Sequence, residues 1–330
     1  MKEKKKSFIE AWRFLAAILL LIHHGRMFDY PTPHFYMGWI YVEFFFMLTG
    51  YFTMKHFSNV EYNSFENIAR SSIQYTFIKF IKFIPYTTSA IFITYLVVNK
   101  GNYNGNNIIN MVLEMTLLYP GDIVLGPIWF LRVLIIVFPL FCILCQIKSK
   151  SLIYILSFLY TILYYNFTGV LHEQYFPGNI FRAIAGLLLG VLVYGISENI
   201  KRMHLHKYQE FLLNILEVVL YVIVFVLTYT NRICFLFILA CMFGANIIFF
   251  SEKTYTSGFS SRVVDYFGKI SMVIYIIHVP IGYILKETTI PLEYIVLIWS
   301  ALSVVIAATL YYVVENMKIF VRKCNHEYDK

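Results

Sequence analysis

An arginine and a histidine share the first apolar stretch of the chain, and both side chain types can act chemically on other molecules. Residues 8–28 are long enough to cross a bilayer as a helix, with Arg13 near one end and His24 near the other. Eleven residues of helix make about three turns, so both side chains should project from one face, about 16 Å apart in depth. Arginine binds anions, and imidazole exchanges protons near neutral pH. The stretch therefore predicts an anion site and an acid–base group on one membrane helix.

Ionisable residues recur at a similar depth in four further apolar stretches. Glu43, Arg132, Arg182 and His278 lie about three to seven residues from the ends predicted to face outside, as His24 does. Such groups are costly in hydrocarbon and normally face a bundle interior or a watery cavity. Each one alone is equally consistent with snorkelling or a structural pair, and for His278 core packing is the stated alternative. Their convergence at one level favours a shared site.

A second group of basic residues lies toward the opposite, predicted cytoplasmic side. Lys79 and Lys82 fall there together with Arg13, where they could hold a polyanionic cofactor by charge and hydrogen bonds. Contact with anionic lipid is the alternative for most loop lysines. Arg13 is less easily explained in that way because it lies deeper.

The composition is that of a polytopic membrane protein surrounded by lipid. Of 330 residues, 59% are hydrophobic and 14% charged, and the mean hydropathy is +0.66. The net charge of +8 does not indicate nucleic acid as a partner, because the basic residues form short clusters between apolar stretches. The pair Cys142 and Cys145 sits inside an apolar stretch without a second pair, which favours packing over metal binding. We expect an all-α bundle and no bound metal.

Apolar stretches alternate across the membrane if the basic loops are placed in the cytoplasm. This positive-inside pattern predicts about ten spans, both termini cytoplasmic, and one domain over residues 1–330 with short tails at about 1–7 and 315–330. Residues 55–83 become a cytoplasmic connection, and residues 108–119, too short to span, become an interfacial or re-entrant segment. The predicted spans are residues 8–28, 36–54, 84–98, 127–147, 152–165, 179–196, 211–229, 233–250, 270–285 and 294–314.

Several short motifs, in this order, resemble the membrane acyltransferase-3 family over nearly the whole chain. Thr49 stands where the family usually has serine, and Lys79 and Lys82 replace two arginines, which keeps the charge but removes the forked guanidinium contacts. The motifs are Arg13 with His24, Glu43 to Thr49-Gly50-Tyr51, Lys79 and Lys82 with Pro85-Tyr86, Pro127 to Leu131, Ser271 to Pro280, and Val314-Glu315.

The resemblance implies transfer of an acyl group, usually acetyl from acetyl-CoA, to a hydroxyl of a cell-surface glycan or its lipid-linked precursor in a bacterial plasma membrane. With that chemistry, Arg13, Lys79 and Lys82 are expected to hold the CoA phosphates. His24 would act as general base or as a transient acyl carrier, with Glu43 orienting its ring. Arg13, His24 and Glu43 are thus the predicted catalytic residues. Arg132, Arg182, Tyr275 and His278 are candidates for binding the acceptor or the oxyanion.

Two other functions fit the same residues. A transporter or flippase also uses intramembrane charges and histidines, although the chain shows no repeated half and no matched pair of broken helices. A membrane sensor would use the same bundle without turnover. The sequence leaves the acceptor, the acyl group and the presence of a homo-oligomer open.

Overall fold

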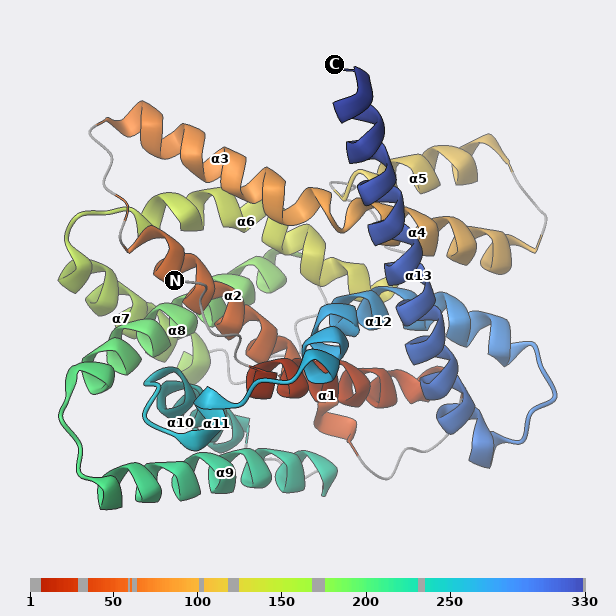
Figure 1. The fold of residues 1–330 in the computed structure, drawn as a ribbon. Coiled ribbons are helices and arrows are strands. Elements are labelled where there is room, and N and C mark those ends of the chain that lie inside the picture. The colour runs from red at the N-terminus through yellow and green to blue at the C-terminus, as the bar shows by residue number, and fades with distance from the viewer. Residues whose placement is uncertain are drawn as a thin grey trace.

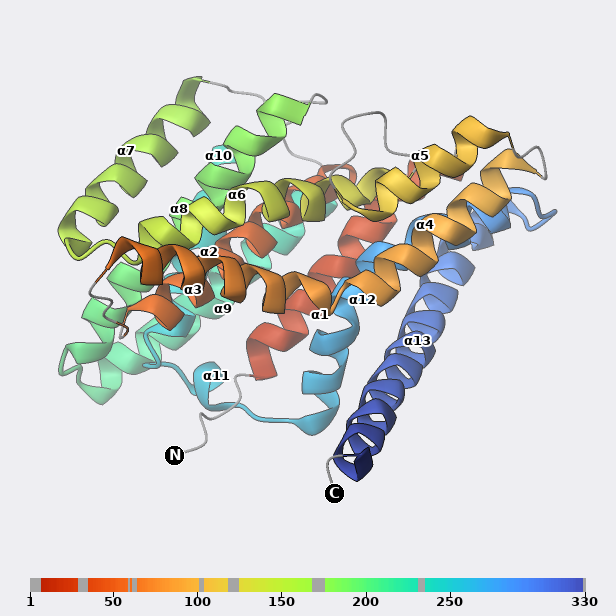
Figure 2. The ribbon, with the colours of Figure 1, turned by 90° about the horizontal axis from the view of Figure 1, so that it is seen from above.

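The structure, a computed structural model, describes residues 7–28, 35–58, 60, 64–100, 104–117, 125–167, 176–230 and 235–328. Within these ranges every regular element is a helix, which confirms the all-α prediction (Figure 1). The basic N-terminal residues Lys2, Lys4, Lys5 and Lys6 and the last two residues of the 108–119 segment lie outside the described residues. Figure 2 shows that α1 (Ser7–His23) begins, and α13 (Leu292–Tyr328) ends, on one side of the bundle.

Each of the ten predicted spans coincides with a helix. Six helices in the described part of the chain are long and apolar enough to span a membrane alone, and the bent pair α3 and α4 would make a seventh. The structure thus supports a multispan membrane protein, while the count of ten and its orientation stay predictions. Besides α1 and α13, the helices at predicted spans are α2 (Tyr41–Phe57), α4 (Ile84–Asn99), α6 (Trp129–Cys145), α7 (Lys150–Phe167), α8 (Phe176–Arg202), α9 (Lys207–Tyr229), α10 (Phe235–Phe250) and α12 (Arg262–Lys286).

Three helices lie outside the predicted spans. The predicted cytoplasmic connection contains α3 (Phe65–Ile81), which begins where the Ser64 hydroxyl accepts a hydrogen bond from the backbone N–H of Asn67. It packs on α6 and meets α4 at a bend of 51°. The predicted short segment contains α5 (Gly105–Met115), which packs on α4, and α11 (Tyr255–Gly258) is a single turn. Short 3₁₀ helices extend α1 and precede α2 and α6: η1 (His24–Phe28), η2 (Tyr36–Ile40) and η3 (Gly126–Ile128).

Helix α1 lies inside the bundle between α2 and α12 (Figure 2). Its most extensive contact is with α12, and its small residues Ala16 and Ala17 are fully buried. Because α1 and α12 run together over much of their length, they can present polar side chains at two depths of the same interface.

Helices α2 and α8 cross at backbone contact. A Cβ atom added to Gly50 would lie 2.0 Å from the carbonyl oxygen of Leu187, and one added to Gly190 would lie 2.2 Å from that of Met47. Backbone atoms cannot move aside as a flexible side chain can. Small residues at such crossings are the usual means by which membrane helices gain packing contacts without a hydrophobic driving force.

We expect Gly190→Ala to separate α2 from α8 and to lower stability by about 1–3 kcal/mol, the typical cost of overpacking. The measurement is thermal unfolding of the detergent-solubilised protein. Gly105→Ala is the matched control, because nothing lies within 4 Å of a Cβ atom at that position. Equal thermal midpoints for the two variants would contradict the close crossing.

Candidate functional site

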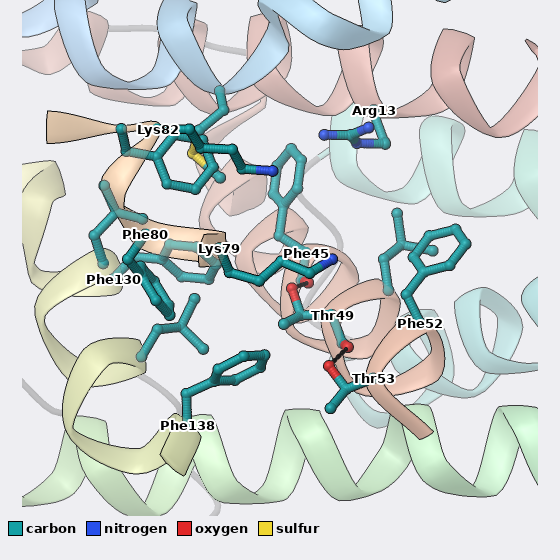
Figure 3. Close-up of a pocket in the computed structure, with 15 residues that line it drawn as sticks. Arg13, Phe45, Thr49, Phe52, Thr53, Lys79, Phe80, Lys82, Phe130 and Phe138 are labelled. Carbon is teal, nitrogen blue, oxygen red and sulfur yellow. Dashed lines mark hydrogen bonds between the residues drawn. The ribbon is translucent and has the colours of Figure 1, made fainter. Parts of the chain in front are cut away.

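The three residues predicted to bind phosphate line one cavity of about 210 Å³. Arg13 comes from α1, Lys79 from the last turn of α3, and Lys82 from the position that directly follows α3. Figure 3 shows the guanidinium of Arg13 and the amino groups of both lysines turned toward the same space. Three cations from two distant stretches of the sequence therefore meet at one site.

The remaining wall of this first cavity is largely apolar. The hydroxyls of Thr49 and Thr53 lie on α2, and each donates to the carbonyl four residues earlier, at 2.7 Å, so their oxygens remain acceptors. The cavity thus combines a cationic part with a ring-lined part, which suits an anion carrying an apolar chain. The rings in the wall belong to Phe45, Phe52, Phe80, Phe83, Phe130 and Phe138.

The cations of this cavity are held with little neutralisation by carboxylates. Arg13 donates to Glu10 at 2.7 Å, whereas the Lys79 amino group lies 4.9 Å from the ring centre of Tyr75 and that of Lys82 lies 5.2 Å from the ring centre of Phe83. Cation–π contacts orient an ammonium without cancelling its charge. An anionic ligand would therefore relieve repulsion among the cations.

At the other end of α1, His24 contacts a histidine of α12. Nε2 of His278 lies 3.2 Å from Nδ1 of His24, and the His278 ring is fully buried, while His24 is half-buried. Trp299 of α13, fully buried, donates its indole N–H to the backbone carbonyl of His278 at 2.6 Å. The α-helix ends at His23, so His24 is the first residue of η1.

The hydrogen-bond partners assign the protons of this pair. The carbonyl oxygen of Ile274, 3.2 Å from Nδ1 of His278, can only accept, so that nitrogen carries a proton. In the neutral ring, Nε2 of His278 then accepts from Nδ1 of His24. The arrangement leaves Nε2 of His24 with a lone pair, as a general base requires.

Glu43 does not orient His24, contrary to the sequence-based prediction. One carboxylate oxygen accepts from Nε of Arg182 at 2.5 Å, and the other accepts from the hydroxyl of Tyr165 at 2.8 Å. Helix α8 carries Arg182 one turn from Gly186 and two turns from Gly190, so the close α2–α8 crossing carries the arginine to Glu43. The side chain that contacts Nδ1 of His24 is instead His278.

Arg182 is buried in this ion pair and enclosed by aromatic rings. Its guanidinium carbon lies 5.6 Å from the ring centre of Trp39 and 5.3 Å from that of Trp129. Both members of the pair are almost inaccessible, with side chains 6% and 0% exposed. This supports a structural role for the pair, because a buried charge needs a partner at short range.

The other predicted acceptor-binding residues do not join the histidines directly. Arg132 is buried and lies within electrostatic reach of Glu114 on α5. The Tyr275 hydroxyl donates to the carbonyl of Pro127 at 2.7 Å, and its ring lies 5.9 Å from Phe130 and 6.0 Å from His278 between ring centres. Because Phe130 lines the first cavity, these ring contacts connect the wall of that cavity to the histidine pair.

Sequence reasoning missed Tyr165 and Trp299 as partners of the polar groups. Both are aromatic residues in apolar stretches, where membrane proteins commonly place them, so neither stood out. Their roles depend on which helices are neighbours in space, and a single sequence carries no signal for that.

We expect Glu43→Gln and Arg182→Gln each to destabilise the protein by about 3–5 kcal/mol, because each leaves one buried charge without its partner. The double variant should lose clearly less than the sum, since neither charge remains. The wild-type protein, the two single variants and the double variant form a double-mutant cycle. Their free energies of unfolding in mixed micelles measure the coupling energy between Glu43 and Arg182. Strict additivity would show that the two charges do not support each other.

The comparisons with known proteins agree with this architecture. A family model described as an acyltransferase domain, Acyl_transf_3, matches residues 6–314. No curated protein and no solved structure matched the chain. Because the family model covers nearly the whole sequence, the chain belongs to the acyltransferase-3 family and is a membrane acyltransferase.

Proposed function

We propose that the protein transfers an acyl group, acetyl in the first instance, from acyl-CoA to a hydroxyl of a cell-surface glycan or its lipid-linked precursor, in a bacterial plasma membrane. The observation that carries this proposal is that α1 bears Arg13 in a cationic, ring-lined cavity and leads directly into His24, which belongs to an imidazole pair. A donor with phosphates and a long thioester arm suits two sites at different depths of one helix.

In this proposal the cationic cavity binds the donor. Arg13, Lys79 and Lys82 hold phosphate groups, Arg13 by its fork and the lysines as point charges. The phenyl rings of the same cavity contact the flexible arm. The rings of Phe130 and Tyr275, which are in contact with each other and lead from this cavity to His278, line the route by which the arm reaches His24.

The acyl transfer itself uses the free nitrogen of His24. Nε2 of His24 takes the proton from the acceptor hydroxyl as its oxygen bonds to the thioester carbonyl carbon. The carbon–sulfur bond then breaks, and His24 returns the proton to the departing thiolate, so an ester and free CoA result. His278 holds the proton on the other nitrogen of His24 in place and acts as a positioning residue.

We expect His24→Ala to lower kcat for CoA release by about 10²–10⁴-fold, because it removes the general base. Arg13→Ala should instead raise KM for acetyl-CoA and change kcat less. The assays are CoA release by purified protein in lipid and mass spectrometry of surface glycans. His204→Ala, at an exposed position in the α8–α9 turn, is the matched control.

Two results would overturn this function. Full glycan acetylation by a well-expressed His24→Ala protein would exclude His24 as the base. Movement of a solute across vesicles by the wild-type protein, without release of CoA, would support the transporter alternative instead.

A further inference from the structure

A second cavity of about 210 Å³ adjoins the first and is lined by α1, α4, α12 and α13. The two cavities share four residues, of which Arg13 and Lys82 are charged. The second cavity adds two cations of its own, Lys269 on α12 and Lys318 on α13. Neither lysine belongs to the motifs that point to the enzyme family.

Positive charge exceeds negative charge around this second cavity. Glu315 in its wall pairs with Lys318 at 2.7 Å, and Arg13 pairs with Glu10 at the same distance. In the part of the chain that the structure describes, neither Lys82 nor Lys269 has a carboxylate within ion-pair distance. Lys82 also lies within electrostatic reach of the cations Arg13, Lys79 and Lys318. A bound anion would neutralise this excess.

A buried hydroxyl in the same wall has no partner. Tyr86 is 3% exposed, and its hydroxyl makes no hydrogen bond to any residue that the structure describes, although its oxygen is inaccessible. Buried polar groups are nearly always hydrogen-bonded, so an unpaired one needs an explanation. A ligand with acceptor oxygens in this cavity would satisfy the hydroxyl. This observation is independent of the charges and indicates the same kind of ligand.

We propose that the second cavity binds a phosphate monoester, the 3′-phosphate at the nucleotide end of CoA, through Lys269, Lys318 and Tyr86. This inference rests on the proposed function. CoA carries phosphate at two places, a diphosphate joined to the arm and a monoester on the ribose. Two adjoining cationic cavities with Arg13 and Lys82 at their boundary match that division. The headgroup of an anionic phospholipid offers the same chemistry, and the test separates the two sources.

The test compares binding of CoA and 3′-dephospho-CoA to the full chain in phosphatidylcholine nanodiscs. The wild-type protein should bind CoA at least about tenfold more tightly, which corresponds to the contribution of the additional phosphate contacts. Tyr86→Phe and Lys269→Gln should each weaken CoA binding several-fold and leave dephospho-CoA binding unchanged. Tyr86→Phe removes only a hydroxyl that has no hydrogen-bond partner in the described part of the chain, so the variant should remain folded.

Two further variants sharpen this comparison. Glu315→Gln removes the negative charge from the same cavity, so it should tighten CoA binding, the opposite sign from Lys269→Gln. Tyr312→Phe is the matched control. Tyr312 follows Tyr311, which lines the cavity, but the Tyr312 side chain is 66% exposed and lies outside the cavity wall. It should leave the binding of both nucleotides unchanged.

The outcomes separate this inference from the proposed function. Equal affinity of the wild-type protein for both nucleotides would overturn the second site and leave the acyl-CoA function standing. No binding of either nucleotide would overturn both. If phosphatidylglycerol added to the nanodiscs bound in a manner sensitive to Lys269→Gln while both nucleotides bound equally, the cavity would be a lipid site and the inference would fail.

Discussion

The packing of α1 against α12 holds both ends of the site in place. Near one end of this interface, Arg13 of α1 and Lys269 of α12 face the same cavity, and near the other end His24 meets His278. The two helices therefore set the distance between the cations and the imidazoles. Other helices contribute side chains that line the cavities next to this pair of helices.

The polar groups of the bundle fall into two kinds. Glu43, Arg182 and Tyr165 satisfy one another in a buried network at the close α2–α8 crossing, which leaves them little capacity to bind a ligand. The cations near Lys82 are incompletely neutralised, and the Tyr86 hydroxyl has no hydrogen-bond partner among the described residues. A satisfied network stabilises the fold, whereas an unpaired buried donor needs an explanation. Beside the excess of cations in the second cavity, a bound anion supplies that explanation.

The positions of polar side chains along one helix were easier to predict from the sequence than the contacts of polar side chains between helices. The placement of Arg13 near one end of α1 and of His24 at the other follows from helical periodicity and length. The partner of Glu43 was predicted wrongly because nothing in a single sequence shows that α8 crosses α2 at glycines. Helix α3 was not predicted because Arg70, Lys79 and several polar residues interrupt its apolar pattern. Hydropathy along the sequence describes such a mixed helix poorly.

The cationic region contains lysines, Lys79 and Lys82, at two positions where the resemblance to the family implies arginines. An arginine presents two parallel donors to one phosphate, whereas a lysine acts as a single point charge on a flexible stem. A pocket built on Lys79 and Lys82 therefore needs further donors to hold a phosphorylated ligand in one orientation. Lys269, Lys318 and the hydroxyl of Tyr86 stand next to it on other helices. In the phosphate site inferred above, these donors from α4, α12 and α13 add contacts on other helices to those of Lys79 and Lys82.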